Sequence, residues 1–276
     1  MYKALSPGAL GLNLPFEQCV ALARKNGFDG IYFDVRWAAD IGPEKAKEVL
    51  DGLKPACFGL PFDYKAEAPE FTERVLELAE LVPAAKALGC ARCSTWIPSW
   101  HDQMDYTDNF MFHRRRLQWI ANTLAQQQIS FGLEFLGPKT LRDGHKYEFV
   151  HDMSEMLRLC YETGVPNLGL LLDSWHWYTS GGTLDDLRKL NANQVIDVHI
   201  NDAPAGVPVD KLKDNIRALP GETGVINVKG FLAALDFIGY KGPVMAEPFS
   251  EKVKAMPPEQ AVAVTAEAIN SVWPAA

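Results

Sequence analysis

The chain has 276 residues and a mass of 30.6 kDa, with 47% hydrophobic and 22% charged residues, which is the composition of a globular protein with a large core. Its net charge of −8 and pI near 5.3 lack the basic excess of a duplex-binding protein, so no nucleic-acid partner is predicted. The N-terminus has no apolar signal-peptide core and no stretch is long enough to cross a bilayer, which predicts a cytoplasmic protein without a membrane partner.

Strand-like and helix-like segments alternate along the whole chain. Short apolar runs are typical of strands buried on both faces, whereas apolar positions three and four apart are typical of amphipathic helices. The predicted strands span residues 4–12, 29–35, 55–60, 91–97, 129–136, 167–173, 195–201 and 242–247. The predicted helices include residues 16–26, 71–88, 113–128, 149–163, 231–238 and 259–272.

Glycine and proline positions agree with this alternation. A glycine follows four of the helical stretches, where a left-handed C-terminal cap favours it, at positions 27, 89, 164 and 239. Pro15 and Pro43 stand near predicted helix starts. Eight strand–helix units imply parallel pairing with right-handed crossovers, which predicts an α/β fold of the (β/α)8 TIM-barrel type, one domain over residues 1–276. An open doubly wound sheet is the alternative, but no Gly-rich dinucleotide fingerprint follows the first strand.

The cysteines predict no disulfide framework. Their number is odd and they are scattered through apolar segments, as Cys19, Cys57, Cys90, Cys93 and Cys160, so we expect reduced core residues. Cys90-Ala-Arg-Cys93 has the spacing of a redox motif. It falls at the start of a strand, where residues three apart point to opposite faces, and this favours a structural role.

Four consecutive predicted strands end in a group that can bind a metal, namely Glu134, Asp173, His199 and Glu247. A charged group at the exit of a buried strand is unfavourable unless it has a partner there. In a barrel these four ends share the rim that carries active sites. Three carboxylates and one imidazole predict one divalent metal ion, with Mn²⁺, Mg²⁺ or Co²⁺ favoured and Zn²⁺ possible.

Three more polar residues lie just beyond these strand ends. His176 is predicted to contact a substrate oxygen, and Asp202 either to orient an imidazole or to stabilise a loop. Arg217, before the turn Pro-Gly-Glu-Thr-Gly224, is a candidate clamp for a carbonyl, hydroxyl or phosphate oxygen.

Tryptophans near the same strand ends could form apolar walls around a sugar. These are Trp96, Trp100, Trp175 and Trp177, and Trp96 and Trp175 are the predicted substrate contacts. Packing in the core is the alternative for each.

This set indicates proton transfer next to a carbonyl. A metal that chelates a ketone and its neighbouring hydroxyl acidifies the adjacent C–H and stabilises a cis-enediolate. Glu134 and Glu247, three strands apart, are the predicted acid and base. Return of the proton on the other face gives epimerisation, and return at the neighbouring carbon gives isomerisation.

At these residues the chain resembles the sugar phosphate isomerase/epimerase family with the xylose-isomerase-like TIM barrel, most closely the inosose (2-keto-myo-inositol) isomerases and then the ketose 3-epimerases. The segments that carry the resemblance are Gly132-Leu-Glu-Phe135, Gly169-Leu-Leu-Leu-Asp-Ser-Trp-His176, Val198-His-Ile-Asn-Asp202, Arg217-Ala-Leu-Pro-Gly-Glu222 and Ala246-Glu247. They cover most of the chain from about residue 125 onward, and the earlier part is less similar.

The resemblance implies metal ligation by the four strand-end residues and acid/base roles for Glu134 and Glu247. It implies that His176 and Arg217 contact oxygens of a small keto sugar or polyol. Many relatives have a glutamate in strand 2 where this chain has Tyr32, and a turn shorter by one residue after Arg217. The substrate wall near Tyr32 and the placement of Arg217 are therefore open.

Other functions remain possible at this level. A metal-dependent dehydratase or lyase acting on a keto-inositol would share the enediolate. A phosphodiester hydrolase like the abasic-site endonucleases is disfavoured by the acidic charge and the few histidines at strand ends. A non-catalytic sugar-binding barrel is the last alternative. Arg217 is the only obvious cation near the site, which favours an unphosphorylated substrate, and a homo-oligomer remains open.

Overall fold

The computed structural model describes residues 1–274 and has the predicted barrel. Nine strands of these residues form one parallel sheet in the order β3-β2-β1-β11-β10-β9-β7-β5-β4. Their bounds are β1 (Tyr2–Leu5), β2 (Gly30–Ile31), β3 (Lys54–Pro55), β4 (Phe58–Gly59), β5 (Arg92–Ile97), β7 (Ser130–Phe135), β9 (Leu168–Asp173), β10 (Val195–Ile200) and β11 (Pro243–Ala246).

The two strands at the ends of this order, β3 and β4, are halves of one barrel strand. Only Ala56 and Cys57 separate them. The Ala56 N–H donates to the Ile31 carbonyl on one side (2.9 Å), and the Leu60 N–H donates to the Ser94 carbonyl on the other (2.9 Å). The short segment thus pairs with both neighbours and closes the sheet into eight strands, as predicted for a TIM barrel.

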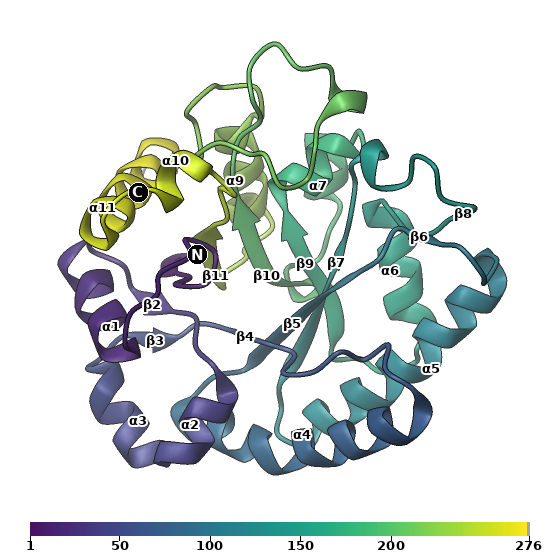
Figure 1. Ribbon diagram of the computed structural model, residues 1–276, viewed down its shortest axis with the longest axis horizontal. Coiled ribbons are helices and arrows are strands. Elements are labelled where there is room, and N and C mark those ends of the chain that lie inside the picture. The colour runs from purple at the N-terminus through teal and green to yellow at the C-terminus, as the bar shows by residue number, and fades with distance from the viewer. Residues whose placement is uncertain (275–276) are drawn as a thin grey trace.

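Helices surround the strands in an outer ring (Figure 1). They are α1 (Phe16–Lys25), α2 (Val35–Ile41), α3 (Pro43–Leu50), α4 (Ala68–Leu88), α5 (Tyr106–Ala125), α6 (Met153–Glu162), α7 (Ser174–Thr179), α8 (Leu184–Arg188), α9 (Val228–Phe237), α10 (Glu251–Lys254) and α11 (Pro258–Val272). Three short 3₁₀ helices are η1 (Lys139–Leu141), η2 (Ala192–Gln194) and η3 (Val209–Lys211), and β6 (Trp100–His101) pairs antiparallel with β8 (Tyr147–Glu148). Within residues 1–274 no helix combines the length and the apolarity needed to span a membrane.

The predicted strand and helix boundaries needed correction mainly in the first half. The strand predicted over 4–12 ends at Leu5, because Pro7 and Gly8 lie in a turn. The strand predicted over 29–35 ends at Ile31, because Asp34 caps α2 by accepting from the Arg36 N–H. Helices α5 and α6 begin at Tyr106 and Met153, behind aspartate caps, and not at residues 113 and 149.

The glycine and cysteine predictions are confirmed. Glycines 27, 89, 164 and 239 all have φ between +72° and +88°, the left-handed region expected after a helix. All five cysteines are buried and unpaired. The Cys90 thiol donates to the Arg92 carbonyl and Cys93 lies within β5, so this pair belongs to the core.

His113 on α5 is expected to make the fold sensitive to mild acid. Its ring is buried between the Asn109 carbonyl and the Tyr64 hydroxyl, and burial lowers the pKa of His113 to about 4. As the pH falls below about 6.5, the unfolded chain takes up a proton that the folded chain refuses, so acidification favours unfolding. Urea unfolding of the wild type should show about 2 kcal/mol less stability at pH 5 than at pH 7 from this group.

The variant His113→Gln should remove most of that difference, because it has no group that titrates in this range. His145→Gln, on a partly exposed histidine that pairs with Asp102, is the matched control and should keep the wild-type pH dependence. An unchanged pH dependence in His113→Gln would contradict the prediction.

Candidate metal centre

Four polar side chains converge at the carboxyl ends of neighbouring strands. The strands β7, β9, β10 and β11 are consecutive in the sheet, so their ends share one rim of the barrel. One ligand atom of each residue lies within 4.8 Å of the others in the set Glu134, Asp173, His199 and Glu247. Asp173 and His199 are direct partners in the ladder, which fixes their spacing. The convergence expected from the sequence is therefore present in the fold.

Several atoms of this cluster are buried without a hydrogen-bond partner among residues 1–274. They are Oε1 of Glu134 and both ring nitrogens of His199. The Nδ1 of His199 is 3.8 Å from Oε1 of Glu134 and 3.7 Å from Oε2 of Glu247. A buried polar atom with no partner is unfavourable, so these atoms indicate that the cluster binds a ligand.

A divalent cation fits this donor set. Oxygen donors with one nitrogen suit Mn²⁺, Mg²⁺, Co²⁺ or Zn²⁺. Two atoms bound to one ion at about 2.0–2.2 Å can be at most about 4.4 Å apart, so shifts of a few tenths of an ångström would bring all four into range. The observed separations of up to 4.8 Å are close to that limit.

The glutamates of the cluster differ in their electrostatic surroundings. Burial raises the pKa of Glu134 well above its usual range, and the neighbouring Glu247 raises it further. Burial acts in the same direction on Glu247, but His199 and Arg217 outweigh it and lower the pKa of this carboxyl. Opposite shifts in two nearby carboxyls are characteristic of acid/base pairs.

Arg217 is buried among the carboxylates. Its Nη1 donates to Oδ2 of Asp173 (2.8 Å) and to Oε2 of Glu247 (2.9 Å). Its Nη2 and Nε donate to Oδ1 and the backbone carbonyl of Asp214, both at 2.8 Å. Its Nη2 also lies 3.4 Å from Nε2 of His176, so all three guanidinium nitrogens contact groups of the protein. The predicted contact of Arg217 with a substrate stays a prediction, and its observed role is to neutralise the acidic cluster.

Trp175 supports Arg217 and does not line the open mouth. The Trp175 ring is fully buried, and its centroid lies 5.3 Å from the guanidinium of Arg217. The ring of Phe249 contacts the same guanidinium, with its centroid at 4.5 Å. The Nε1 of Trp175 is buried without a hydrogen-bond partner among the described residues, and the predicted contact of Trp175 with substrate stays a prediction. The rings of Trp177 and Trp100 also pack elsewhere, on Phe231 and His145 respectively.

Trp96 has the position expected of a mouth residue. It lies two residues after Ser94 on β5, so both side chains point to the same face of the strand. Ser94 points into the barrel, because its hydroxyl donates to Asp197 (3.2 Å). Trp96 pairs in register with Glu134 and is 49% exposed. It therefore remains available as the predicted sugar-binding wall.

His176 faces the cluster from the first turn of α7. Its Nδ1 accepts from the Gly137 N–H (3.2 Å), and its Nε2 lies 3.4 Å from Nη2 of Arg217. The same Nε2 lies 3.7 Å from Oε1 of Glu134 and 3.7 Å from Oδ1 of Asp214. Burial, reinforced by Arg217, lowers the pKa of His176 well below its usual value, so the ring is neutral. The predicted substrate contact is compatible with this placement and stays a prediction.

Asp202 stabilises a loop, which was one of its two predicted roles; the other, orientation of an imidazole, is wrong. Its backbone bridges to Ala218. Its carboxylate accepts backbone N–H groups at 2.7–3.0 Å from Ala203, Thr223, Gly224 and Ile226. Asp202 thereby anchors the segment that carries Arg217, the green loop beyond the arrowheads of β9 and β10 in Figure 1.

Asp197 is the carboxylate that lies beside the His199 ring, and sequence reasoning missed it. Its Oδ2 is 3.6 Å from the Nε2 of His199. Tyr32 donates its hydroxyl to Oδ1 of the same carboxylate. Burial alone would raise the pKa of Asp197, but His199 and Tyr32 outweigh it and lower the value. The signal was present in Val-Ile-Asp-Val-His199, because residues two apart on a strand share a face.

An open cavity of about 370 Å³ leads to His199 from the side of β1 and β2. Its wall includes Phe16, Tyr32 and Phe33, with the polar groups of Ser6 and Asp34. A small polyol fits a cavity of this size, since small-molecule sites range from about 300 to 1,000 Å³. The aromatic wall predicted from the tryptophans is thus supplied in part by other aromatic residues.

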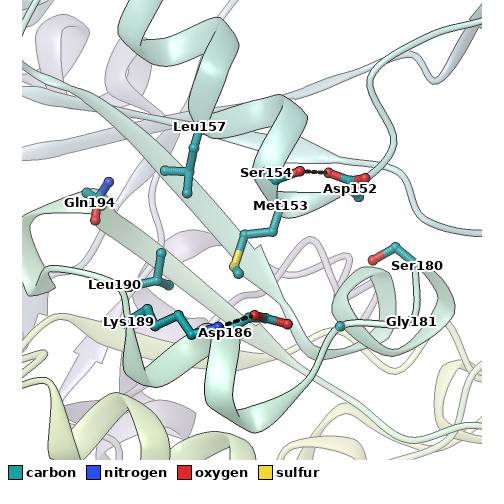
Figure 2. A pocket seen from close by; sticks show the side chains of 11 residues that line it. Asp152, Met153, Ser154, Leu157, Ser180, Gly181, Asp186, Lys189, Leu190 and Gln194 are labelled. Atoms are coloured by element: carbon teal, nitrogen blue, oxygen red, sulfur yellow. Dashed lines mark hydrogen bonds and ion pairs between the residues drawn. The ribbon is translucent and has the colours of Figure 1, made fainter.

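A second hollow on the outside of the barrel has no such chemistry (Figure 2). It has a volume of about 480 Å³ and lies between α6 and the segment around α8. Its charged groups are paired with their own neighbours, Asp152 with Ser154 (2.9 Å) and Asp186 with Lys189 (3.1 Å). None of the four cluster residues lines it, so the barrel mouth is the candidate site.

Several curated relatives of this chain are named for inosose. An inosose isomerase of Halalkalibacterium halodurans is 26% identical over 256 residues, which is 86% of this chain and 84% of the relative. An inosose dehydratase of Geobacillus thermodenitrificans is 30% identical and covers 89% of each chain.

Solved structures show the same fold over nearly the whole chain. A xylose isomerase domain protein from Alicyclobacillus acidocaldarius has a TM-score of 0.89 and 28% identity, covering 99% of this chain and 98% of its own. The IolI protein with a zinc atom has a TM-score of 0.82 and 20% identity, with coverage of 99% and 98%. The D-psicose 3-epimerase of Clostridium cellulolyticum with D-tagatose has a TM-score of 0.77 and 14% identity, with the same coverage.

The family model for the xylose isomerase-like TIM barrel matches residues 11–272, nearly the full length of the chain. With the closed eight-stranded barrel and the acidic rim described above, this match places the sequence in a known group. The chain belongs to the xylose isomerase-like TIM barrel family.

Proposed function

We propose that this protein is a divalent-metal-dependent isomerase or epimerase of a keto sugar or keto-inositol, with Glu134 and Glu247 as acid and base. The observation that carries the proposal is the buried cluster of four ligand groups within 4.8 Å of one another, several of whose atoms lack a partner. Relatives named inosose isomerase, which align over most of both chains, support the same class of substrate.

Glu134, Asp173, His199 and Glu247 would hold the metal. When bound, a divalent cation supplies polarisation of the substrate carbonyl and compensation for negative charge that develops on its oxygens. We propose manganese, magnesium or cobalt as the metal because the donor set is rich in oxygen, and zinc remains a candidate.

The two glutamates are placed to move a proton. Glu134 belongs to β7 and Glu247 follows β11, with β9 and β10 between them, so they approach a molecule in the mouth from different sides. One carboxylate removes the proton next to the carbonyl, and the other carboxyl returns it. The neutral His176 ring and Nη2 of Arg217 beside it face the cluster, where they can contact a substrate oxygen, and burial of the cluster limits the access of water.

The charges at the mouth favour an unphosphorylated substrate. Arg217 is already bonded to three carboxylates. Lys65, beside the Trp96 ring, pairs with Asp63 at 2.6 Å. A phosphate would need cations that are not engaged in this way, so we propose a neutral polyol.

A dehydratase acting on a keto-inositol is the second candidate. It is favoured by the relative named inosose dehydratase, the more identical of the two relatives described above. The same proton abstraction would then be followed by loss of a hydroxyl group, so release of water from the carbon skeleton distinguishes the two reactions.

The test is deuterium exchange in D₂O followed by NMR. The protein is treated with a chelator, resupplied with Mn²⁺ and incubated with a panel of ketoses and inososes. We expect deuterium at the carbon next to the carbonyl of one substrate class, and none with the chelated protein, because proton abstraction requires carbonyl polarisation. A dehydrated product would select the dehydratase. No exchange and no product across the panel would contradict both proposals.

A further inference from the structure

Asp197 is a carboxylate in the barrel interior that faces the ring of His199 and, within the described part of the chain, has no lysine or arginine beside it. It is fully buried, and among residues 1–274 no lysine or arginine nitrogen lies within 4.0 Å of it. A buried carboxylate is unfavourable unless its oxygens are bonded. The role of this residue is therefore to be found in its hydrogen bonds and in the ring next to it.

Three donors fix the position of the Asp197 carboxylate. The Tyr32 hydroxyl and the Val198 N–H (2.9 Å) donate to Oδ1. The Ser94 hydroxyl donates to Oδ2 (3.2 Å). These donors come from three barrel strands or their ends, β2, β5 and β10, so the carboxylate cannot rotate without breaking a contact in the core. Its Oδ2 then faces the Nε2 of His199 at 3.6 Å.

The two nitrogens of the His199 ring face different partners. Nε2 faces Asp197, whereas Nδ1 faces Glu134 and Glu247 at 3.8 and 3.7 Å. A neutral imidazole has one N–H and one lone pair, and an acceptor near one nitrogen determines which is which. When a cation lies between Nδ1 and the two glutamates, it uses the Nδ1 lone pair, so the single proton of the ring must be on Nε2, where Asp197 is the carboxylate that faces it.

We propose that Asp197, held by Tyr32 and Ser94, is the positioning residue that fixes the tautomer and orientation of His199 for metal binding through Nδ1. This inference rests on the metal centre of the proposed function. It assigns a role to Tyr32, which stands in the wall of the cavity and donates its hydroxyl to the positioning carboxylate.

The sharpest test is Asp197→Asn, which keeps the shape of the side chain. Its amide would present an N–H toward Nε2 of His199, which favours a lone pair there and a proton on Nδ1, pointing at the cluster. We expect Mn²⁺ and Co²⁺ affinity, measured by calorimetry, to fall about 10- to 100-fold. Tyr32→Phe removes one bond to Asp197 and should lose less, about 3- to 10-fold.

Tyr240→Phe is the matched control. Tyr240 is also a buried tyrosine of the barrel, but its hydroxyl donates to the backbone carbonyls of Pro243 and Ile196. It should bind metal like the wild type. If Asp197→Asn does not fold, the inference is tested by comparing the metal affinities of Tyr32→Phe and Tyr240→Phe.

A second measurement separates this inference from the proposed function. Burial lowers the pKa of His199, but Asp197 and Glu247 outweigh it and raise the pKa well above its usual value. Long-range ¹H–¹⁵N NMR of histidine-labelled protein under chelation is therefore recorded at alkaline pH, where the ring is neutral and its tautomer can be read directly. The wild type should carry the proton on Nε2, and Asp197→Asn should not. Metal affinity within twofold of wild type in Asp197→Asn and Tyr32→Phe, or an unchanged tautomer in Asp197→Asn, would overturn the inference. A wild type with this tautomer that binds no metal would instead refute the metal centre alone.

Discussion

Replacing Glu134 by glutamine is expected to abolish exchange at the substrate carbon while leaving the fold at least as stable as the wild type. Glu134 is buried next to Glu247, and both burial and that neighbour raise its pKa. A carboxyl whose pKa is raised on folding lowers stability once the pH exceeds its unfolded value, about 4.3, because the unfolded chain then releases a proton that the folded protein retains. Glutamine removes this ionisation and keeps the side-chain volume.

The activity of Glu134→Gln should fall by at least about 10²- to 10⁴-fold, the usual contribution of a general acid or base. Urea unfolding under chelation should show equal or greater stability at pH 7. Glu247→Gln is the matched variant, and we expect it to lower the stability of the fold. His199 and Arg217 lower the pKa of Glu247, so its charge is favourable in the fold and its loss should destabilise the protein.

These two variants together test the acid/base assignment. Activity should be lost in both, whereas stability should change in opposite directions. If Glu134→Gln keeps wild-type exchange, the role of Glu134 as acid or base is wrong. If both variants lose stability equally, the electrostatic description of the two glutamates is wrong, whatever happens to the activity.

The convergence of the cluster was predictable because it depends on regular structure. Parallel strands that alternate with helices bring their carboxyl ends to one edge, so a residue's place at a strand end is sufficient to locate it. Glu134, Asp173 and His199 lie on strands of six residues, and Glu247 directly follows β11, whose four residues are all buried, so the pattern is clear there. The first strands are only two to four residues long, and there the predicted boundaries were wrong.

The contacts between the cluster and its surroundings were less predictable, because they depend on side-chain geometry. Asp202 was considered as the partner of His199, since it lies three residues beyond it. The chain leaves the strand after Ile200 and turns toward Ala218, which carries Asp202 away from the ring. Asp197, two residues before His199, shares its face of the strand and is the actual neighbour.

The contacts of Arg217, a loop residue, were likewise not predictable from the sequence. The turn after it predicted a side chain over the barrel mouth, but the sequence does not show that its N–H groups bond to Asp173, Glu247 and Asp214. Those bonds depend on how the loop closes, and Asp202 fixes the loop through backbone N–H groups far from Arg217 in the chain. A substrate clamp and a counter-charge for carboxylates look alike in sequence.

Replacing Arg217 by methionine is expected to cause the largest loss of stability among these variants. The guanidinium is 1% exposed and bonds to Asp173, which is fully buried, and to Glu247. Removing one partner of a buried ion pair leaves an uncompensated charge and destabilises by about 3–5 kcal/mol. Urea unfolding under chelation should show a loss of about this size.

Saturating Mn²⁺ should recover a substantial part of that loss, because a divalent cation in the cluster would supply positive charge where the guanidinium was removed, and a ligand that binds only the folded protein stabilises it. Arg116→Met is the matched control. Arg116 bonds to the backbone carbonyls of Tyr64 and Ala66, away from the cluster, so its stability loss should not depend on the metal beyond the wild-type effect. If Arg217→Met loses the same stability with and without Mn²⁺, the guanidinium and the metal do not share the charge of these carboxylates, and the cluster is then a structural ion-pair network closed by Arg217.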